Sequence, residues 1–174
     1  MNLLGLDFGT TSLKSAVYNK AGECLFTHET TYDLIHHDGF IEFNADEYLS
    51  MLLSSINAAS DICSIYALAI DTQCETMILA DDNGNPLCNA IVWLDNRGQK
   101  EALQIKNDFG TRLIYEKTGQ CDISGIWPAC KLLWIKNNLP EVWVKTRKIF
   151  LLEDWLLYKL TGRFVTQKTL QSSS

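Results

Sequence analysis

The sequence lacks an apolar run long enough to cross a membrane, and it is poor in basic residues. Its 174 residues include 21 Asp and Glu but only 15 Lys and Arg, which gives a formal net charge of -6. A membrane-spanning helix needs about 20 consecutive apolar residues. Nucleic acid binding needs clustered basic side chains that neutralise phosphates. We therefore expect a protein that binds neither a membrane nor a nucleic acid.

Metal-site and disulfide patterns are also missing. The six cysteines form no C-x-x-C pair and have no metal-ligand spacing with the three histidines. The beginning of the chain shows neither the basic segment nor the cleavage site of a signal peptide. Reduced thiols are typical of the cytosol. These features predict a cytoplasmic protein with reduced cysteines at Cys24, Cys63, Cys74, Cys88, Cys121 and Cys130.

The composition is that of a globular chain. Hydrophobic residues make up 47% and aromatic residues 10% of the sequence, which argues against disorder. A chain of this length buries one good core, so length alone predicts one domain.

The first segment of the chain pairs an apolar run with a polar turn that suits a bound phosphate. Leu3–Asp7 and Leu13–Tyr18 are predicted to be strands. The carboxylate at the end of the first strand can hold Mg²⁺, and a glycine lets the backbone approach an anion. Turn amides, hydroxyls and a lysine can bind phosphate oxygens. The predicted nucleotide site consists of Asp7, as the metal ligand, with Gly9, Thr10, Thr11, Ser12 and Lys14.

A plain hairpin turn is the competing interpretation, because Asp, Gly and Thr are common in turns. Two other phosphate motifs are excluded. No G-x-x-x-x-G-K-[ST] loop occurs anywhere in the chain. Asp7-Phe8-Gly9 spells the metal motif of protein kinases, but the partner motifs of those enzymes are missing.

A second polar segment follows the strand predicted at residues 65–70. It contains Gln73, Cys74 and Glu75 and leads, through an Asn-Gly hairpin, to Trp93 at the end of the next apolar run. A carboxylate that accepts hydrogen bonds from hydroxyls, beside an indole that stacks on a carbon backbone, would form a polyol site. The alternative is a solvated Glu75 and a core Trp93, and spacing alone leaves both open.

The other elements are predicted from periodicity and end signals. Glu23–Thr31 alternates as a third strand, and His36 and His37 fall in a polar loop. Asn44 is an N-cap for an amphipathic helix. The first three strands are expected to be antiparallel and the later strands parallel.

The part that follows Trp93 is predicted to be mostly helical. Pro128 suits the first position of one helix, and Gly119 and Gly162 suit helix ends. We interpret Trp134, Trp143 and Trp155 as packing residues.

Five segments, in order along the chain, resemble motifs of the FGGY family of carbohydrate kinases. D-F-G-T-T-S-x-K resembles its first phosphate loop, and the Q-C-E and W-x-D-x-R segments resemble its acceptor region. K-L-L-W and L-L-E-D-W-L-L-Y-K-L-T-G-R-F resemble its later helices. The resemblance implies an α/β fold of the ribonuclease H-like (actin-like ATPase) type, with a mixed sheet flanked by helices.

The resemblance also implies ATP-dependent phosphorylation of a hydroxyl on a small sugar or polyol, with ATP and Mg²⁺ as cofactors. Glu75 and Trp93 match an acceptor-binding Glu and Trp, whereas Asp95 and Arg97 are expected to form a structural ion pair. Glycerol kinase-like members have Arg at the position of Cys74, and xylulokinase-like members have Met-His in place of Cys74-Glu75. The acceptor therefore stays open among ketopentoses, deoxyketoses, aldonates and alditols. The predicted substrate-binding residues are Gln73, Cys74, Glu75 and Trp93.

Finally, the resemblance assigns residues 1–174 to an incomplete first domain. Family members take their general base from an Asp in a later Gly-rich segment, and residues 163–174 contain no carboxylate. We expect no catalytic base in this chain, no second domain and no turnover by the chain alone. We also expect exposed apolar surface and self-association as a homo-oligomer. The alternative function is a non-catalytic actin-like interaction or assembly module, which would not need a polyol site.

Overall fold

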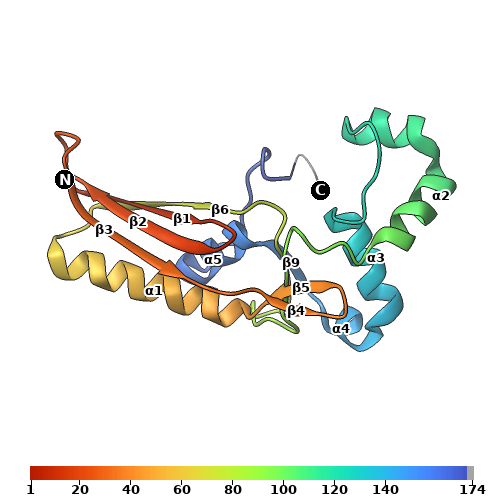
Figure 1. Cartoon of the computed structure of the whole chain (residues 1–174), viewed down its shortest axis with the longest axis horizontal. Coiled ribbons are helices and arrows are strands. Elements are labelled where there is room, and N and C mark those ends of the chain that lie inside the picture. The colour runs from red at the N-terminus through yellow and green to blue at the C-terminus, as the bar shows by residue number, and fades with distance from the viewer. Residues whose placement is uncertain (172–174) are drawn as a thin grey trace. The chain divides into compact units, whose positions relative to one another are not determined.

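The computed structural model describes residues 1–171 and divides them into two compact units (Figure 1). The first unit comprises Met1–Leu34 and Asn44–Gln73, and the second comprises Ile35–Phe43 and the chain from Cys74 onward. Each unit has its own β-sheet. None of the described helices is long and apolar enough to span a membrane.

The sheet of the first unit has four strands in the order β3-β2-β1-β6. β1 pairs antiparallel with β2, β2 pairs antiparallel with β3, and β6 runs parallel to β1. The antiparallel arrangement of the first three strands is thereby confirmed, and β1 lies in the interior of the sheet. The predicted strand at residues 65–70 begins and ends two residues later in the structure. The strands are β1 (Leu3–Phe8), β2 (Ser12–Tyr18), β3 (Cys24–Thr31) and β6 (Ala67–Thr72).

One helix, α1 (Ala45–Ile62), packs against this sheet (Figure 1). Its N-cap is Asn44, as predicted, whose side chain accepts a hydrogen bond from the backbone N–H of Asp46 at 3.0 Å. The apolar face of α1 is buried, and so are alternate side chains of β1 and β2. Strand residues of the opposite parity, such as Asp7 and Lys14, are exposed on the other face. The buried side chains include Leu4, Leu6, Phe8, Leu13, Val17, Tyr48, Leu52 and Ala59.

The sheet of the second unit has five strands in the order β4-β5-β8-β7-β9, and every pair is antiparallel. The prediction that the later strands run parallel holds for β6 but is wrong for β7, β8 and β9. A hairpin joins β7 to β8, and β9 adds to the free edge of β7 in the opposite direction. The strands are β4 (Ile35–His37), β5 (Phe40–Phe43), β7 (Met77–Ala80), β8 (Ala90–Ile91) and β9 (Lys148–Leu151).

The loop predicted at His36 and His37 is also wrong, since both residues belong to β4. β4 has three residues and is exposed along its whole length, so it lacks the alternation that identifies a half-buried strand. The tight turn to β5 passes through Asp38 and Gly39, which both have positive φ.

Four helices complete the second unit, and the predicted end signals hold. Pro128 begins α3, and Gly119 and Gly162 adopt left-handed conformations after α2 and α5. Trp155 is fully buried and donates its Nε1–H to the carbonyl of Gly84 at 2.9 Å, which confirms its packing role. The helices are α2 (Gln99–Thr118), α3 (Pro128–Asn138), α4 (Pro140–Lys145) and α5 (Leu152–Thr161).

Candidate functional site

The predicted phosphate loop connects β1 to β2 in the first unit. The backbone N–H of Gly9 donates to the carbonyl of Ser12 at 3.0 Å, so the turn is tight. Asp7 stands opposite Lys14 in the antiparallel register, and both side chains are exposed. The two residues therefore lie on one hairpin, with side chains that face open space.

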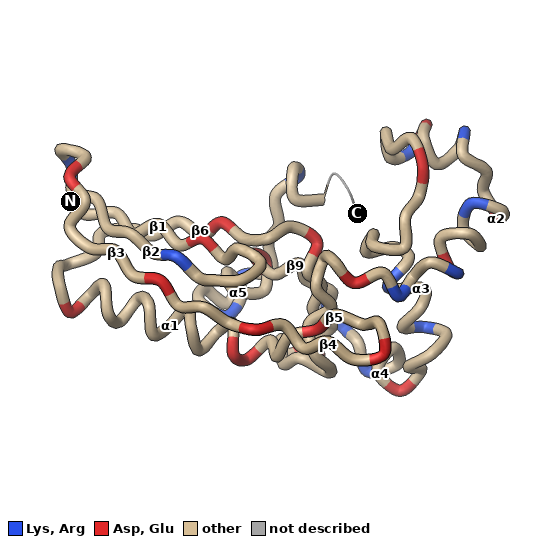
Figure 2. The backbone as a smooth tube through the Cα atoms, viewed as in Figure 1, with Lys and Arg blue, Asp and Glu red and all other residues tan. Residues whose placement is uncertain are grey.

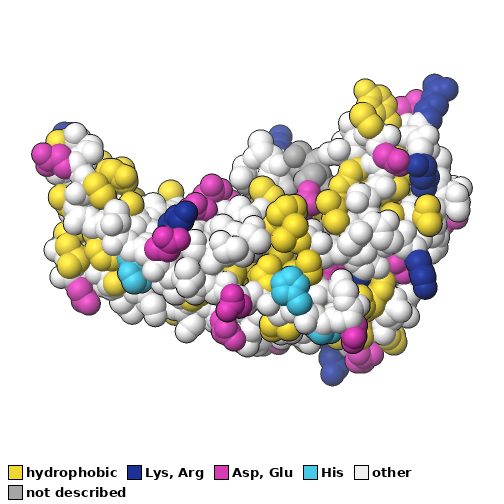
Figure 3. All heavy atoms as spheres, in the orientation of Figure 1, with side chains coloured by type: hydrophobic (Ala, Val, Ile, Leu, Met, Phe, Trp, Pro, Cys, Tyr) yellow, Lys and Arg dark blue, Asp and Glu magenta, His cyan; other side chains and the backbone are white. Residues whose placement is uncertain are grey.

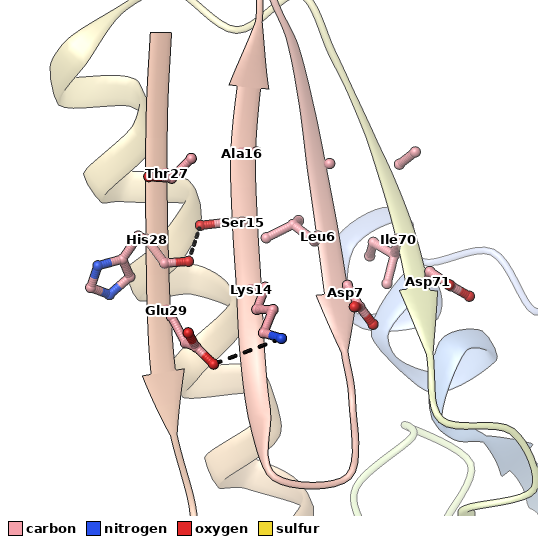
Figure 4. A pocket seen from close by; sticks show the side chains of 12 residues that line it. Leu6, Asp7, Lys14, Ser15, Ala16, Thr27, His28, Glu29, Ile70 and Asp71 are labelled. Atoms are coloured by element: carbon pink, nitrogen blue, oxygen red, sulfur yellow. Dashed lines mark hydrogen bonds and ion pairs between the residues drawn. The ribbon is translucent and has the colours of Figure 1, made fainter. Parts of the chain in front are cut away.

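Asp7 and Lys14 line a groove of about 640 Å³ on the exposed face of the sheet (Figure 4). The Lys14 ammonium lies 4.0 Å from a Glu29 carboxylate oxygen, and the two side chains are 62% and 53% exposed. Such an exposed ion pair contributes little to stability, so Lys14 can rearrange toward an anionic ligand. Asp71 of β6 stands beside Asp7 in the parallel register. Figure 2 shows the basic segment of β2 among acidic segments of neighbouring strands.

The three hydroxyl residues of the loop differ in accessibility. Thr11 is exposed and Thr10 is partly exposed, whereas Ser12 is buried at the start of β2. A phosphate that approaches from solvent would therefore meet the two threonines before the serine.

Tyr32 is a site residue that the sequence analysis missed. Its hydroxyl donates to the carbonyl of Gly9, and its backbone N–H donates to the carbonyl of Thr11 at 3.1 Å. Burial raises the pKa of Tyr32 to about 12, so the hydroxyl keeps its proton at neutral pH. The two bonds hold the phosphate loop from the side of β3.

Gln73 connects the same tyrosine to the end of β6. Its side-chain amide donates to the hydroxyl oxygens of Tyr32 at 3.3 Å and Tyr48 at 2.9 Å. Its backbone N–H donates to the carbonyl of Phe8 at 2.6 Å. Gln73 is 9% exposed, and its side-chain oxygen has no hydrogen-bond partner among the described residues. The geometry thus gives Gln73 a part in holding the loop, while its contact with an acceptor stays a prediction.

Cys74 and Glu75 form a turn that leads into β7 in the second unit. Cys74 is exposed and Glu75 is partly exposed. Glu75 has a φ of 63°, in the left-handed region that residues other than glycine rarely adopt. Backbone strain of this kind collects at functional sites, where it fixes the direction of a side chain.

A hydrogen bond joins this turn to the segment that carries Trp93. The backbone N–H of Trp93 donates to Oγ1 of Thr76 at 3.3 Å, and Thr76 is fully buried. The structure therefore brings the backbone of Trp93 to the residue that follows Glu75. A pocket shared by the Glu75 and Trp93 side chains stays a prediction.

The ion pair expected between Asp95 and Arg97 is confirmed. Two guanidinium nitrogens of Arg97 donate to the two Asp95 carboxylate oxygens, each at 2.9 Å, and a third bond of 2.7 Å reaches Glu42. Although burial opposes ionisation, hydrogen bonds from Arg97 and from the backbone of Ile41 hold the pKa of Asp95 below its usual range. The guanidinium also lies over the rings of Phe40 and Trp134. The pair is structural.

A mixed four-stranded sheet, whose first hairpin carries the predicted phosphate loop, is the sheet of an actin-like ATPase fold. The chain belongs to the FGGY family of carbohydrate kinases, because the model of the family's N-terminal domain matches residues 2–174.

Three relatives show this kinship. Xylulose kinase of Staphylococcus xylosus is 27% identical over 169 residues, which cover 95% of this chain and 35% of that protein. The crystal structure of gluconate kinase from Lactobacillus acidophilus has a TM-score of 0.90 and 27% identity, and the match covers 99% of this chain and 35% of that one. The crystal structure of Plasmodium falciparum glycerol kinase with ADP has a TM-score of 0.87 and 27% identity, and the match covers 99% of this chain and 37% of that one. The chain spans about a third of the length of these relatives.

Proposed function

We propose that this chain is the N-terminal part of an ATP-dependent kinase that phosphorylates a hydroxyl of a small sugar or polyol. The observation that carries the proposal is the hairpin on which Asp7 and Lys14 stand in register beside a glycine and two accessible threonines. Relatives that are xylulose, gluconate and glycerol kinases support the reaction class, and the relative with ADP supports an adenine nucleotide.

The exposed carboxylate of Asp7 suits Mg²⁺, which prefers oxygen ligands and keeps several of its waters. When bound, the ion would neutralise charge on the transferred phosphoryl group. Thr10, Thr11 and Lys14 would bind the nucleotide phosphates, and Tyr32 would keep the loop in shape through Gly9. Catalysis in this reaction class is mainly positioning and charge neutralisation.

Glu75 and Trp93 would orient the acceptor: the carboxylate would accept hydrogen bonds from hydroxyls, and the indole would pack on the carbon chain. Gln73 and Cys74, which precede Glu75 in the chain, are the other two proposed substrate-binding residues. The identity of the acceptor stays open because Cys74 matches neither the Arg of glycerol kinase-like members nor the Met of xylulokinase-like members.

We place the general base outside residues 1–174, so the chain alone should not turn over. A cytoplasmic location stays a prediction, in keeping with six free thiols at the cysteine positions. The family match leaves the alternative, an actin-like assembly module, without support.

A thermal-shift screen tests the acceptor site. The complete protein that contains this chain is melted with a panel of ketopentoses, deoxyketoses, aldonates and alditols, each with and without Mg-ATP. We expect one class of acceptor to raise the Tm, and we expect Glu75→Ala to remove that rise while the shift caused by Mg-ATP remains. Stabilisation by ATP alone, with no response to any acceptor, would contradict the proposal.

A further inference from the structure

Lys131 of α3 is a fully buried lysine in the second unit, with 0% of its surface exposed. Lysine is almost never fully buried unless its ammonium is paired. The sequence analysis gave this residue no role beyond its place in the K-L-L-W motif. Its surroundings therefore need an explanation of their own.

The Lys131 ammonium binds the backbone of the proposed acceptor site. Its Nζ donates to the carbonyl of Val92 at 2.9 Å and to the carbonyl of Trp93 at 3.3 Å. On the other side of the same residue, the N–H of Trp93 donates to Thr76, which follows Glu75. The backbone of Trp93 is thus held at both its N–H and its C=O by side chains from two other parts of the unit.

Charged groups around Lys131 affect its pKa, and one of them is Glu75, the other proposed acceptor-binding residue. Burial lowers the pKa of Lys131 to about 8, while the carboxylates of Asp95 and Glu75 oppose that change. Arg97 lowers the pKa further, and Cys130 raises it slightly. Asp95 is already held by Arg97 through two hydrogen bonds, which leaves Glu75 as the other nearby carboxylate that the ammonium attracts.

We propose that Lys131 is a positioning residue of the acceptor site, which fixes the Trp93 backbone through the carbonyls of Val92 and Trp93. The inference rests on the proposed function for the identity of the ligand, but the contacts themselves need no ligand. A purely structural lysine would stabilise the unit without changing the affinity for the acceptor.

The first test follows the indole N–H signals of the five tryptophans by NMR in the 174-residue chain between pH 6 and pH 10. A Cys74→Ser background removes the exposed thiol next to Glu75. We expect the Trp93 signal, assigned with Trp93→Phe, to shift with a midpoint near the Lys131 pKa of about 8. The Trp155 signal should not shift with that midpoint. The transition should vanish in Lys131→Met and persist in Lys136→Met, which changes an exposed lysine of the same helix.

A Trp93 signal that shows no transition near pH 8 in the Cys74→Ser protein would overturn the proposal, and this measurement does not depend on whether Lys131→Met folds. An identical transition in folded Lys131→Met would overturn it as well.

The second test separates positioning from general stability in the complete protein. Lys131→Met should raise the KM for the acceptor about tenfold and leave the KM for ATP unchanged. A loss of kcat with both KM values unchanged would contradict the positioning role. If the complete protein phosphorylates no acceptor while the NMR transition is present, the proposed function fails but the link between Lys131 and Trp93 stands.

Discussion

Asp7, the next-to-last residue of β1, has an exposed side chain, and the metal chemistry proposed for this protein depends on that one carboxylate. Asp7→Asn keeps the shape of the side chain but removes the charge that is proposed to hold Mg²⁺. We expect the complete protein to lose most of its turnover while its thermal melt stays unchanged, since substitutions at exposed positions usually shift stability by about 0.5 kcal/mol or less. Asp61→Asn, on an exposed part of α1, is the matched control and should leave kcat unchanged. Near-normal turnover in Asp7→Asn would show that the metal role is wrong.

Glu75 combines a proposed ligand contact with a left-handed backbone, so two substitutions separate its effects. Glu75→Ala and Glu75→Gly both remove the carboxylate and should each lower kcat/KM for the acceptor by about 1–3 kcal/mol. Glycine adopts positive φ without steric cost, so Glu75→Gly should be more stable than Glu75→Ala by about 1 kcal/mol in urea unfolding. Equal stabilities would indicate that the turn is not strained, and an unchanged kcat/KM would remove Glu75 from the acceptor site.

Lys131 predicts a pH dependence of stability. Its pKa falls from the usual lysine value of 10.5 to about 8 in the folded chain, so between these pH values the unfolded chain binds more protons. Stability therefore rises as pH increases from about 8 to about 10.5, by up to about 3 kcal/mol from this group. Urea unfolding of the wild type and of Lys131→Met at several pH values measures this rise as the difference between the two curves. Parallel curves would mean that folding does not lower the pKa of Lys131.

At the residue scale, local sequence signals were enough to predict the hairpin of Asp7 and Lys14 and the ion pair of Asp95 and Arg97. They could not reveal Tyr32 or Lys131, because those side chains act on backbone atoms 23 and 38–39 positions away. Such contacts depend on which strands pair with each other, and the periodicity of apolar residues along the sequence does not predict strand pairing.

At the scale of elements, the close approach of α2 and α3 depends on Gly98, which precedes α2. A Cβ at this position would lie 2.8 Å from both the Cβ of Cys130 and the carbonyl oxygen of Gly125. We expect Gly98→Ala to lower the free energy of unfolding by about 1–3 kcal/mol, as overpacking does. Gly5→Ala is the control, because its Cβ would come no closer than 3.9 Å to another residue. Equal unfolding free energies for the two variants would show that the packing at Gly98 adjusts without cost.

The helices could be predicted from the sequence, but the second sheet could not. The helices were predicted well because Asn44, Pro128, Gly119 and Gly162 mark their ends locally. The second sheet was not predicted, because β4 has three residues and β8 has two, which is too short to show an alternation of apolar and polar residues.

At the scale of the whole molecule, exposed apolar side chains at the N-terminal end of the first sheet favour self-association (Figure 3). Leu3 is 46%, Tyr18 45% and Leu25 42% exposed, and Leu3 stands opposite Tyr18 in the register. Contiguous exposed apolar surface is typical of interaction sites. We expect concentration-dependent association of the chain in sedimentation velocity, weakened by Leu3→Glu with Tyr18→Glu. A monomer at every concentration, or association unaffected by the two changes, would contradict this expectation.

The central claim is that this chain supplies the phosphate loop and acceptor site of a carbohydrate kinase whose general base lies elsewhere. The most direct measurement is transfer of phosphate from Mg-ATP to a panel of sugars and polyols, detected as a phosphorylated product. The complete protein and residues 1–174 alone are assayed side by side. We predict product from at least one acceptor with the complete protein and none with residues 1–174 alone. Failure of the complete protein to phosphorylate any acceptor, or acceptor-dependent product from residues 1–174 alone, would contradict the account.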